Sequence, residues 1–387
     1  MNDLAPALAL YVHWPYCARI CPYCDFNVVR DRGQAVQETL AKAILADMEG
    51  QRILTGPRRL TSIYLGGGTP SLMQPAWAAA IIARASALWT LADDIEITLE
   101  ANPTDAEAAR FAAFAALGVS RLSLGVQSLD DAALRFLGRN HDAAQGRGAI
   151  DAGLAAFPRV SFDLIYALPG QTAAAWQAEL TLAAALGAEH ISPYQLTFEH
   201  GTALTRAAQR GTVLPPPNDL AADLFEVTQS VLTATGFDAY EVSNHARGAA
   251  ARSRHNLAYW QGVDYVGVGP GAHGRLTLAD GRIATQGRRR VADYITGVAS
   301  TGLGFDSPER LDSLAVAQER LLMGLRTDAG VPLAVLGPLK LTAQSPRLQD
   351  ALTDGLIKLV DGRLIATEIG RLVLDRVTFA LAASEVA

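Results

Sequence analysis

Apolar runs and alanine-rich amphipathic segments alternate over residues 1–235 of this 387-residue chain, and this alternation strongly constrains the fold. The runs have the length and composition of buried parallel strands, and the segments between them have helical periodicity. The expected strands are residues 8–14, 61–66, 94–100, 121–126, 160–167 and 190–197, and the expected helices are residues 34–49, 74–89, 105–117, 130–156, 173–186 and 218–235. Such units favour a parallel sheet with right-handed crossovers. Six units fit an open, partial (β/α)6 barrel, and a flat doubly wound sheet is the alternative.

Polar and glycine residues gather at the carboxyl ends of these expected strands, where β/α barrels build their active sites. A cysteine cluster follows the first strand, and the glycine-rich sequence GGGTP at residues 66–70 follows the second. The third strand ends at Glu100, the fourth ends at Gln127, and Asp163 lies inside the fifth. Because these residues converge on one face of the sheet, together they predict a functional site there.

Cys17, Cys21 and Cys24 are the three cysteines of the chain, and their C-x3-C-x2-C spacing places three thiols within reach of one inorganic centre. A structural zinc site normally has four ligands, and an iron–sulfur cluster is usually held by four thiolates. A cluster held by three thiolates leaves one iron with an open coordination position, as catalytic metal sites do. The alternatives are zinc with a remote fourth ligand and three unrelated buried thiols.

The sequence YVHWPYCARICPYCDFN at residues 11–27 resembles the radical SAM superfamily in its coproporphyrinogen-oxidase-like branch, and within it the HemW-type heme chaperones. The oxidases of that branch carry a further cysteine where this chain has Phe26. They also have a longer segment before the motif than the 16 residues that precede Cys17. The resemblance implies a [4Fe-4S] cluster on Cys17, Cys21 and Cys24, with the open iron binding S-adenosylmethionine (SAM).

The same resemblance implies a set of SAM-binding residues. They are Tyr11, Tyr23, Gly67, Gly68, Thr69, Glu100, Gln127, Arg139 and Asp163. In the family, the glycine turn approaches the amino end of SAM, and the arginine meets its carboxylate in a charge-assisted pair. Without the resemblance, the glycines could simply form a turn, and Glu100 could be an ordinary carboxylate at a strand end. Arg139 could likewise cap the C-terminus of a helix. Asp163 lies between apolar residues and therefore needs a firm partner, whereas packing alone would explain the tyrosines.

A second motif, HNLAYW at residues 255–260, matches the HNxxYW pattern of HemW-type proteins. We expect it on an irregular loop between short strands at residues 237–243 and 265–268. Histidine is a common axial ligand of heme iron, and aromatic rings suit the face of a porphyrin. The motif therefore predicts a heme site with His255, Tyr259 and Trp260, and a purely structural loop is the alternative.

The last part of the chain, residues 305–387, resembles a winged-helix domain. A helix is expected over residues 307–325, a hairpin around Asp361 and Gly362, and a further helix over residues 367–376. Winged helices often bind DNA, but the acidic charge balance favours a lid or a docking surface here. The expected domains are therefore the barrel at residues 1–236, a barrel extension with HNxxYW at 237–304, and this appendage.

The net charge of −6 argues against sequence-independent binding of nucleic acid, so no nucleic-acid partner is expected. The N-terminus lacks a secretion signal and no apolar run is long enough to span a bilayer, which predicts a cytoplasmic protein, peripheral at the membrane through partners. The resemblance implies a heme chaperone. Its expected partners are heme, heme-acceptor proteins (respiratory, membrane-associated ones included), an electron donor if SAM is cleaved, and a second copy. The alternative is a radical SAM coproporphyrinogen III oxidase or another porphyrin-modifying enzyme.

Overall fold

The computed structural model describes residues 5–31 and 33–383, and its main feature is a sheet of twelve strands. Six neighbouring strands of this sheet run parallel in chain order. They are β1 (Ala7–Trp14), β4 (Arg59–Gly67), β5 (Thr90–Ala101), β6 (Arg121–Gln127), β7 (Arg159–Tyr166) and β8 (His190–Gln195). Each overlaps one of the six predicted strands, which confirms the predicted parallel sheet.

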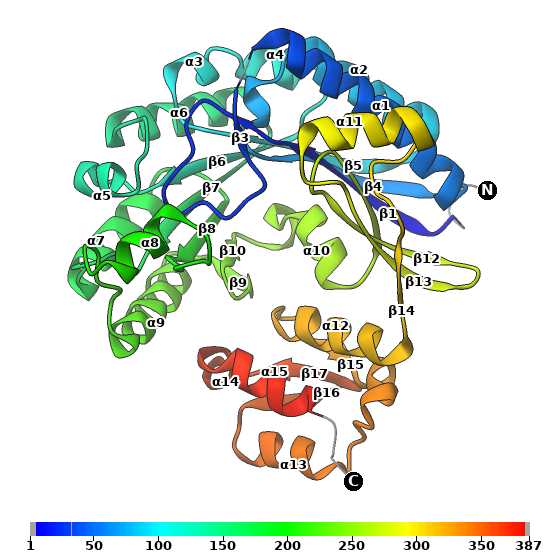
Figure 1. Ribbon diagram of the computed structural model, residues 1–387. Coiled ribbons are helices and arrows are strands. Elements are labelled where there is room, and N and C mark those ends of the chain that lie inside the picture. Colours follow the sequence, from blue (N-terminus) through cyan, green and yellow to red (C-terminus); the bar gives the residue numbers. More distant parts are fainter. Residues whose placement is uncertain (1–4, 32, 384–387) are drawn as a thin grey trace.

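Helices follow these strands and lie on the convex side of the curved sheet (Figure 1). They are α1 (Gln34–Thr55), α2 (Pro75–Leu88), α3 (Asp105–Ala108), α4 (Phe111–Ala116), α5 (Asp131–Phe136), α6 (Ala143–Ala156), α7 (Ala173–Ala184), α8 (Ala203–Gln209) and α9 (Asn218–Ala234), with a 3-10 turn, η1 (Pro70–Leu72). The order of the six strands never reverses, so the crossovers all cover one face of the sheet. This topology is that of an open, partial barrel, and the doubly wound alternative, which requires a reversal, is wrong.

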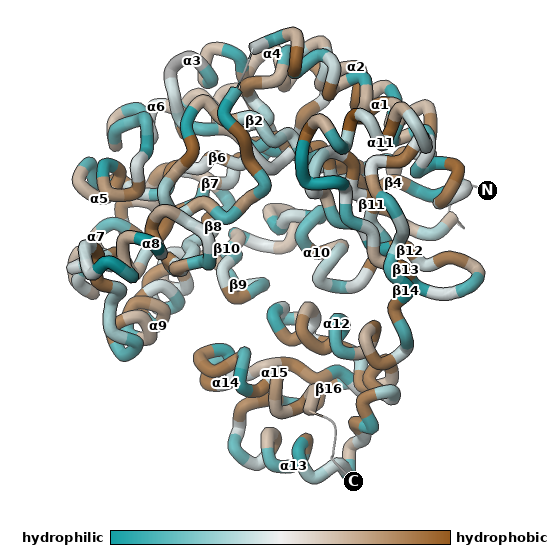
Figure 2. The backbone as a smooth tube through the Cα atoms, viewed as in Figure 1, coloured by the Kyte–Doolittle hydropathy of each residue, from teal (hydrophilic) through white to brown (hydrophobic). Residues whose placement is uncertain are grey.

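Burial of apolar side chains between the sheet and its helices holds the barrel together. Leu10, Leu65, Leu99 and Leu124, from four adjacent strands, are completely buried in one core. Figure 2 shows apolar and polar residues interleaved along the surrounding helices, as expected where one side of a helix packs on a sheet. None of the helices in the described ranges combines the length and apolar character that crossing a membrane requires.

Residues 237–304, predicted as an extension of the barrel, add strands at both edges of the sheet. At one edge, β10 (Asn244–Ala246) pairs with β8 and with β9 (Asp238–Glu241). At the other, β11 (Asp264–Val268) runs parallel to β1 and is followed by antiparallel β12 (His273–Leu278), β13 (Gly281–Gln286) and β14 (Glu309–Leu311). The helix α11 (Val291–Thr301) lies against α1 (Figure 1). The chain thus returns to the first strand of the barrel after completing the last.

The HNxxYW motif lies on a short helix, α10 (Arg254–Trp260), so the prediction of an irregular loop was wrong. A 3-10 turn, η2 (Ala249–Ala251), precedes it, and the Ser253 hydroxyl caps it by accepting a hydrogen bond from the backbone N–H of Asn256. The Glu96 carboxylate on β5 accepts a second bond, from the Arg254 N–H at 2.8 Å. These partners satisfy free N–H groups of the first turn and fix the helix against the concave side of the sheet.

The C-terminal residues form a separate core below α10 (Figure 1). Its elements are α12 (Ser313–Leu325), β15 (Val331–Pro332), η3 (Leu333–Leu339), α13 (Pro346–Thr353), β16 (Ile357–Val360), β17 (Arg363–Ala366), α14 (Glu368–Leu372) and α15 (Leu374–Ala382). The predicted hairpin is confirmed: β16 and β17 pair across Asp361 and Gly362, which both have the positive φ of a tight two-residue turn. The winged-helix character of the whole unit stays a prediction.

The predicted helix at residues 307–325 begins later than expected. Residues 309–311 instead form β14, which pairs with β13 at the edge of the main sheet. The helix starts at Ser313 because the Asp312 side chain accepts a hydrogen bond from the N–H of Ala315 and caps it. The strand therefore links the main sheet directly to the first helix of the C-terminal unit.

Candidate functional site

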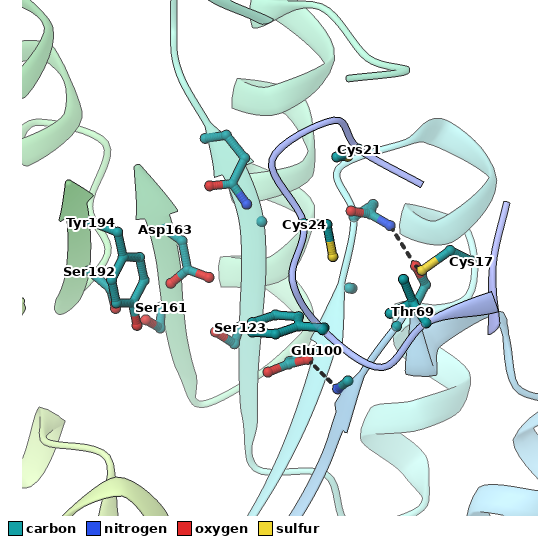
Figure 3. Close-up of a pocket in the computed structure, with 18 of the residues that line it drawn as sticks. Cys17, Cys21, Cys24, Thr69, Glu100, Ser123, Ser161, Asp163, Ser192 and Tyr194 are labelled. Atoms are coloured by element: carbon teal, nitrogen blue, oxygen red, sulfur yellow. Dashed lines mark hydrogen bonds between the residues drawn. The ribbon is translucent and has the colours of Figure 1, made fainter. Parts of the chain in front are cut away.

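A polar cavity of about 220 Å³ opens at the carboxyl ends of the parallel strands, beneath the cysteine loop (Figure 3). All of the residues predicted to bind SAM, except Tyr11, line this cavity. In Figure 3, Cys17 and Cys24 lie on one side, near Thr69 and Glu100, and Asp163, Ser161, Ser192 and Tyr194 form the opposite wall. The structure therefore brings together residues from β4, β5, β6, β7 and β8 at the face where the sequence predicts a site.

The three cysteines lie on one loop between the short paired strands β2 (Tyr16–Cys17) and β3 (Val29–Arg30), and all three line the cavity. Burial raises the pKa of the Cys17 thiol and raises that of Cys24 to about 11. Among the described residues, no three donor groups converge tightly enough for a single metal ion. A four-iron cluster does not need such convergence, because each thiolate binds a different iron.

The side chain of Asn27 anchors the far end of this loop. Its amide nitrogen donates to the carbonyl oxygens of Pro270 at 2.8 Å and Arg289 at 2.9 Å. The backbone carbonyl oxygen of Asn27 lies 2.9 Å from Nε2 of His13 on β1. The loop is therefore held to the β11–β12 connection and to the segment after β13 by contacts that do not involve the cysteines.

A chain of hydrogen bonds connects Cys17 to Cys21 across the cavity wall. The Thr69 hydroxyl lies 3.6 Å from the sulfur of Cys17 and accepts a bond from the Asn102 amide at 2.9 Å. The Asn102 carbonyl oxygen in turn accepts from Arg139, whose Nη1 lies 3.3 Å from the sulfur of Cys21. These bonds place a hydroxyl beside Cys17 and a cation beside Cys21, so both thiols have polar neighbours within the cavity wall.

Glu100 is fixed at the end of β5 by two hydrogen bonds. One carboxylate oxygen accepts from the Tyr64 hydroxyl and the other from the backbone N–H of Gly67, each at 2.8 Å. Burial raises the pKa of the carboxyl, and both bonds oppose that rise. A side chain at Gly67 would collide with the ring of His13, and one at Gly68 with the backbone of Pro15 and Tyr16. Glycine is therefore required for the β4 end to lie this close to β1 and β2.

Gln127 and Asp163 complete the wall at the ends of β6 and β7. Gln127 has a φ of 70°, a left-handed conformation that a non-glycine residue rarely adopts, at a register shift between β6 and β7. Burial and the nearby Glu100 raise the pKa of Asp163 to about 7, although a hydrogen bond with Ser192 opposes this. The site therefore contains two carboxyl groups whose ionisation is opposed by burial.

The donor set of the cavity fits SAM, which carries an amino group, a carboxylate and polar nucleoside edges. Nε of Arg139 and the hydroxyl of Thr98 are buried without a hydrogen-bond partner. Both residues line the cavity. Buried polar atoms are normally paired, so these two residues supply bonding capacity that a polar ligand can use. Glu100 and Asp163 supply acceptors, and Arg139 supplies the positive charge that a carboxylate requires.

Tyr11, also predicted to contact SAM, lies outside the lining of this cavity. Its hydroxyl is 2.9 Å from Nδ1 of His13, and its ring lies near the rings of Tyr64 and His255. Tyr11 therefore supports Tyr64, which does line the cavity and holds Glu100. A direct role of Tyr11 in SAM binding stays a prediction.

The ring of His255 contacts the ring of Tyr259, with 6.2 Å between centroids, but its polar partner lies on the barrel side. The His255 side chain is buried, its Nδ1 lies 3.0 Å from the Ser62 hydroxyl, and its ring packs against Tyr64 with 4.8 Å between centroids. Burial lowers its pKa to about 3, which keeps the ring neutral. Tyr259 and Trp260 instead line a groove between α10 and α12. Heme ligation by His255 stays a prediction, and it requires this side chain to leave its partners.

Several residues that shape the site were not predicted as site residues from the sequence. Tyr64 holds Glu100, Asn102 links Thr69 to Arg139, and Glu96 anchors α10. Tyr64 occupies an expected strand, and its alternation with apolar neighbours was the signal available. No local sequence pattern indicates the role of Glu96, because the residues that it bonds lie far away in the chain.

Comparison with known proteins identifies the same family as the motif. Residues 11–183 match the family model of the radical SAM superfamily. The chain is 43% identical over 333 residues to mouse (Mus musculus) radical S-adenosyl methionine domain-containing protein 1, mitochondrial, covering 84% of this chain and 74% of that protein. It is 34% identical over 371 residues to heme chaperone HemW of Mycobacterium tuberculosis, covering 95% of this chain and 93% of that one.

Among solved structures, coproporphyrinogen III oxidase (HemN) from Escherichia coli, a radical SAM enzyme, superposes with a TM-score of 0.81. The superposition covers 98% of this chain and 90% of the oxidase, at 21% sequence identity. At that identity the likeness establishes a shared fold, and it confirms the predicted α/β architecture.

Proposed function

This chain belongs to the radical SAM superfamily, and from that premise we propose that it is a heme chaperone that carries a SAM-coordinated [4Fe-4S] cluster. Membership of the superfamily implies SAM and the cluster. The heme cargo is supported by the likeness to heme chaperone HemW, which extends over 95% of this chain. That likeness is the observation that carries the proposal, because it includes the C-terminal unit as well as the barrel.

In this proposal Cys17, Cys21 and Cys24 hold the cluster, and the polar cavity holds SAM. When bound, a three-thiolate cluster supplies an open iron position for SAM and an electron for its reductive cleavage. The chain itself contributes Arg139 as the partner of the SAM carboxylate and the Gly67–Gly68 backbone as a close surface for its amino end. Tyr23, Thr69, Glu100, Gln127 and Asp163 complete the contacts as proposed SAM-binding residues.

We further propose heme-acceptor proteins as partners, respiratory and membrane-associated ones among them, and an electron donor if SAM is cleaved. We also propose a cytoplasmic location, peripheral at the membrane through partners, and a second copy of the chain as a further partner. The three-part division at residues 236 and 304 is proposed on the same basis. The C-terminal residues of the separate core begin at Ala317, and residues 309–311 still pair with the main sheet, so the core supports a C-terminal unit that starts after β14.

Anaerobic reconstitution with iron and sulfide, followed by heme titration, tests the proposal. We expect wild-type protein to take up about one cluster and one heme, measured by iron content and absorbance. Cys17→Ser, Cys21→Ser and Cys24→Ser should each lose the cluster, because serine is a poor ligand for iron in such sites.

A reconstituted protein that takes up no heme would overturn the chaperone proposal. Oxidation of coproporphyrinogen III in the same anaerobic preparation would instead establish the oxidase alternative. Phe26, with a 62% exposed side chain, occupies the position of the further cysteine of those oxidases, which favours the chaperone.

A further inference from the structure

Ser161 on β7 faces the polar cavity one layer below Asp163. Side chains two residues apart on a strand point to the same face of a sheet, and both of these residues line the cavity. Figure 3 shows them on the wall opposite Cys17 and Cys24. Ser161 is paired in register with His190 of the neighbouring strand β8. A ligand that contacts Asp163 therefore has Ser161 as its next polar neighbour on this strand.

Behind Ser161, a chain of three hydrogen bonds leads away from the cavity. The Ser161 hydroxyl oxygen lies 2.6 Å from Nδ1 of His190, and Nε2 of the same ring lies 2.7 Å from the Tyr240 hydroxyl. The Tyr240 oxygen also accepts a bond from the backbone N–H of Ser253 at 3.2 Å. Each of these residues is at most 4% exposed. At such burial, a donor left without a partner in this chain would be costly.

The partners of Tyr240 fix the direction of the whole chain. Among the residues that the structure describes, Nε2 of His190 is the acceptor available for the Tyr240 proton, so Nε2 carries no proton of its own. Burial, together with Arg121 and His245, lowers the pKa of His190 well below its ordinary value. The ring is therefore neutral, and its single N–H is at Nδ1. That N–H donates to the oxygen of Ser161.

The opposite direction of the chain is less stable. If Nε2 of His190 carried the proton, it would donate to Tyr240, and the Tyr240 oxygen would then accept two bonds. The proton of Tyr240 would have no partner within the described part of the chain. Burying an unpaired donor costs at least as much free energy as a typical hydrogen bond contributes. The arrangement with Nδ1 protonated is therefore the favoured one.

Ser161 consequently presents its own proton to the cavity. Its oxygen accepts from His190, and no other residue in the described ranges bonds this hydroxyl. Asp163, one layer above, offers an acceptor, so the two residues provide complementary groups on one wall. A hydroxyl whose direction is already fixed loses little freedom when a ligand binds, which favours affinity.

We infer that Ser161 donates a hydrogen bond to an acceptor atom in the nucleoside part of SAM, and that His190 and Tyr240 are positioning residues that fix the direction of this bond. The inference rests on the proposal that the polar cavity holds SAM. The nucleoside is the expected partner because Arg139, the proposed partner of the carboxylate, contacts Cys21 on the cysteine loop. Adenine nitrogens and ribose oxygens supply the acceptor.

Three ligands separate the nucleoside part of SAM from its amino-acid part. In the reconstituted full chain, Ser161→Ala should bind SAM and 5′-deoxyadenosine about three- to tenfold more weakly, as expected for the loss of one hydrogen bond. Binding of methionine, which lacks the nucleoside, should be unchanged. Ser86→Ala, on the exposed side of α2, is the matched control and should bind all three ligands as wild type does. Calorimetric titration measures each affinity.

Tyr240→Phe tests the positioning role, because Tyr240 is not part of the cavity lining. Without its hydroxyl, Nε2 of His190 loses its donor, and Ser161 can turn its proton toward Nδ1. The affinity for SAM should therefore fall by about two- to threefold. Thr228→Val removes a buried hydroxyl that bonds Trp176 between α7 and α9. This control should lower stability and leave SAM affinity unchanged.

Nitrogen NMR of the ligand-free chain with 15N-labelled histidine reads the tautomer directly. We expect His190 to show a protonated Nδ1 and an unprotonated Nε2, assigned by the signals missing from His190→Gln. In Tyr240→Phe the balance of the two tautomers should change, because Nε2 no longer accepts a bond. This measurement needs neither the cluster nor SAM.

The outcomes distinguish this inference from the function on which it rests. A protonated Nε2 of His190 in wild type would overturn the inference and leave SAM binding standing, and so would unchanged SAM affinity in Ser161→Ala. An equal loss of methionine affinity in Ser161→Ala would also overturn it, because the contact would not then be with the nucleoside. Wild-type protein that binds no SAM would overturn the proposed function of the cavity itself.

Discussion

Nη1 of Arg139 lies 3.3 Å from the sulfur of Cys21, and Nη2 of the same guanidinium donates to the Asn102 side chain and the Gly125 carbonyl. Arg139 thus contacts the cysteine loop and also lines the polar cavity. Its planar fork makes three contacts in different directions, which a lysine ammonium on a flexible stem cannot reproduce.

Replacing Arg139 by lysine should therefore weaken SAM binding by about tenfold or more, because at least one hydrogen bond to a charged group is lost. Calorimetric titration of reconstituted protein with SAM would measure this. Arg135→Lys, an exposed position on α5, is the matched control and should bind SAM as wild type does. Equal SAM affinity in Arg139→Lys would show that the guanidinium does not contact the ligand.

Gly68→Ala should lower stability by about 1–3 kcal/mol, because its methyl group would meet the Pro15 and Tyr16 backbone oxygens at 2.8 Å. Gly148→Ala, on the exposed side of α6, has nothing within 4 Å of the added carbon. This control should gain about 0.5–1 kcal/mol from helix propensity. Thermal unfolding of both variants checks the pair, and a Gly68→Ala protein as stable as wild type would contradict the packing at the β4 end.

Glu96→Gln should destabilise the protein by about 3–5 kcal/mol. The carboxylate is 1% exposed and lies 2.8 Å from Arg121, whose guanidinium is also buried. The amide keeps the shape but leaves that cation without its charge partner. Denaturant unfolding measures the loss. Asp94→Asn on the same strand breaks an exposed pair with Arg254 and should cost at most about 1 kcal/mol. Similar losses in the two variants would mean that burial of Glu96 is not decisive.

Asp163→Asn should change how the stability of the ligand-free protein depends on pH. The pKa of this carboxyl is raised from 3.8 in its ordinary form to about 7 in the fold. The folded protein therefore holds a proton that the unfolded chain has already released, and stability from this group falls as pH rises from about 4 to about 7. Because asparagine cannot ionise, the variant should not show this loss of stability with rising pH.

The free energy of unfolding of the variant should therefore rise relative to that of wild type as the pH increases across this window. The rise should be at most about 4 kcal/mol, for a shift of about three pKa units. Unfolding curves at about pH 4.5 and about pH 8, roughly the two ends of the window, give the comparison. A difference between variant and wild type that stays constant with pH would show that Asp163 is ionised in the folded protein throughout.

The parallel strands could be predicted from the sequence because each is buried on both faces and forms a local apolar run. The pairing of β11 with β1 could not be predicted from the sequence. This pairing places Leu8 beside Asp264, and nothing in the sequence of either segment specifies the other as its partner. The start of α12 was misplaced for a related reason, since residues 309–311 become a strand only where the edge of β13 is available.

Some features of the candidate site could likewise be predicted from the sequence, and others could not. Cys17, Glu100 and Arg139 belong to motifs that are readable along the chain, and they do meet at one cavity. The burial of His255 depends on Glu96, whose carboxylate bonds the N–H of Arg254 158 residues further on, and on Ser62. Such distant partners leave no local pattern, so the sequence predicts an irregular loop for HNxxYW where the structure has a helix.

Tyr194, Asn244 and Asn256 line both the polar cavity and the groove between α10 and α12, and this shared wall has a thermodynamic consequence. A ligand that reorients these side chains from one side alters the affinity on the other, and the coupling free energy is identical in both directions. If bound SAM raises the affinity of the protein for its cargo by some factor, bound cargo raises the affinity for SAM by the same factor. Dissociation of either ligand then lowers the affinity for the other, so a single coupling free energy governs both loading and release of the cargo.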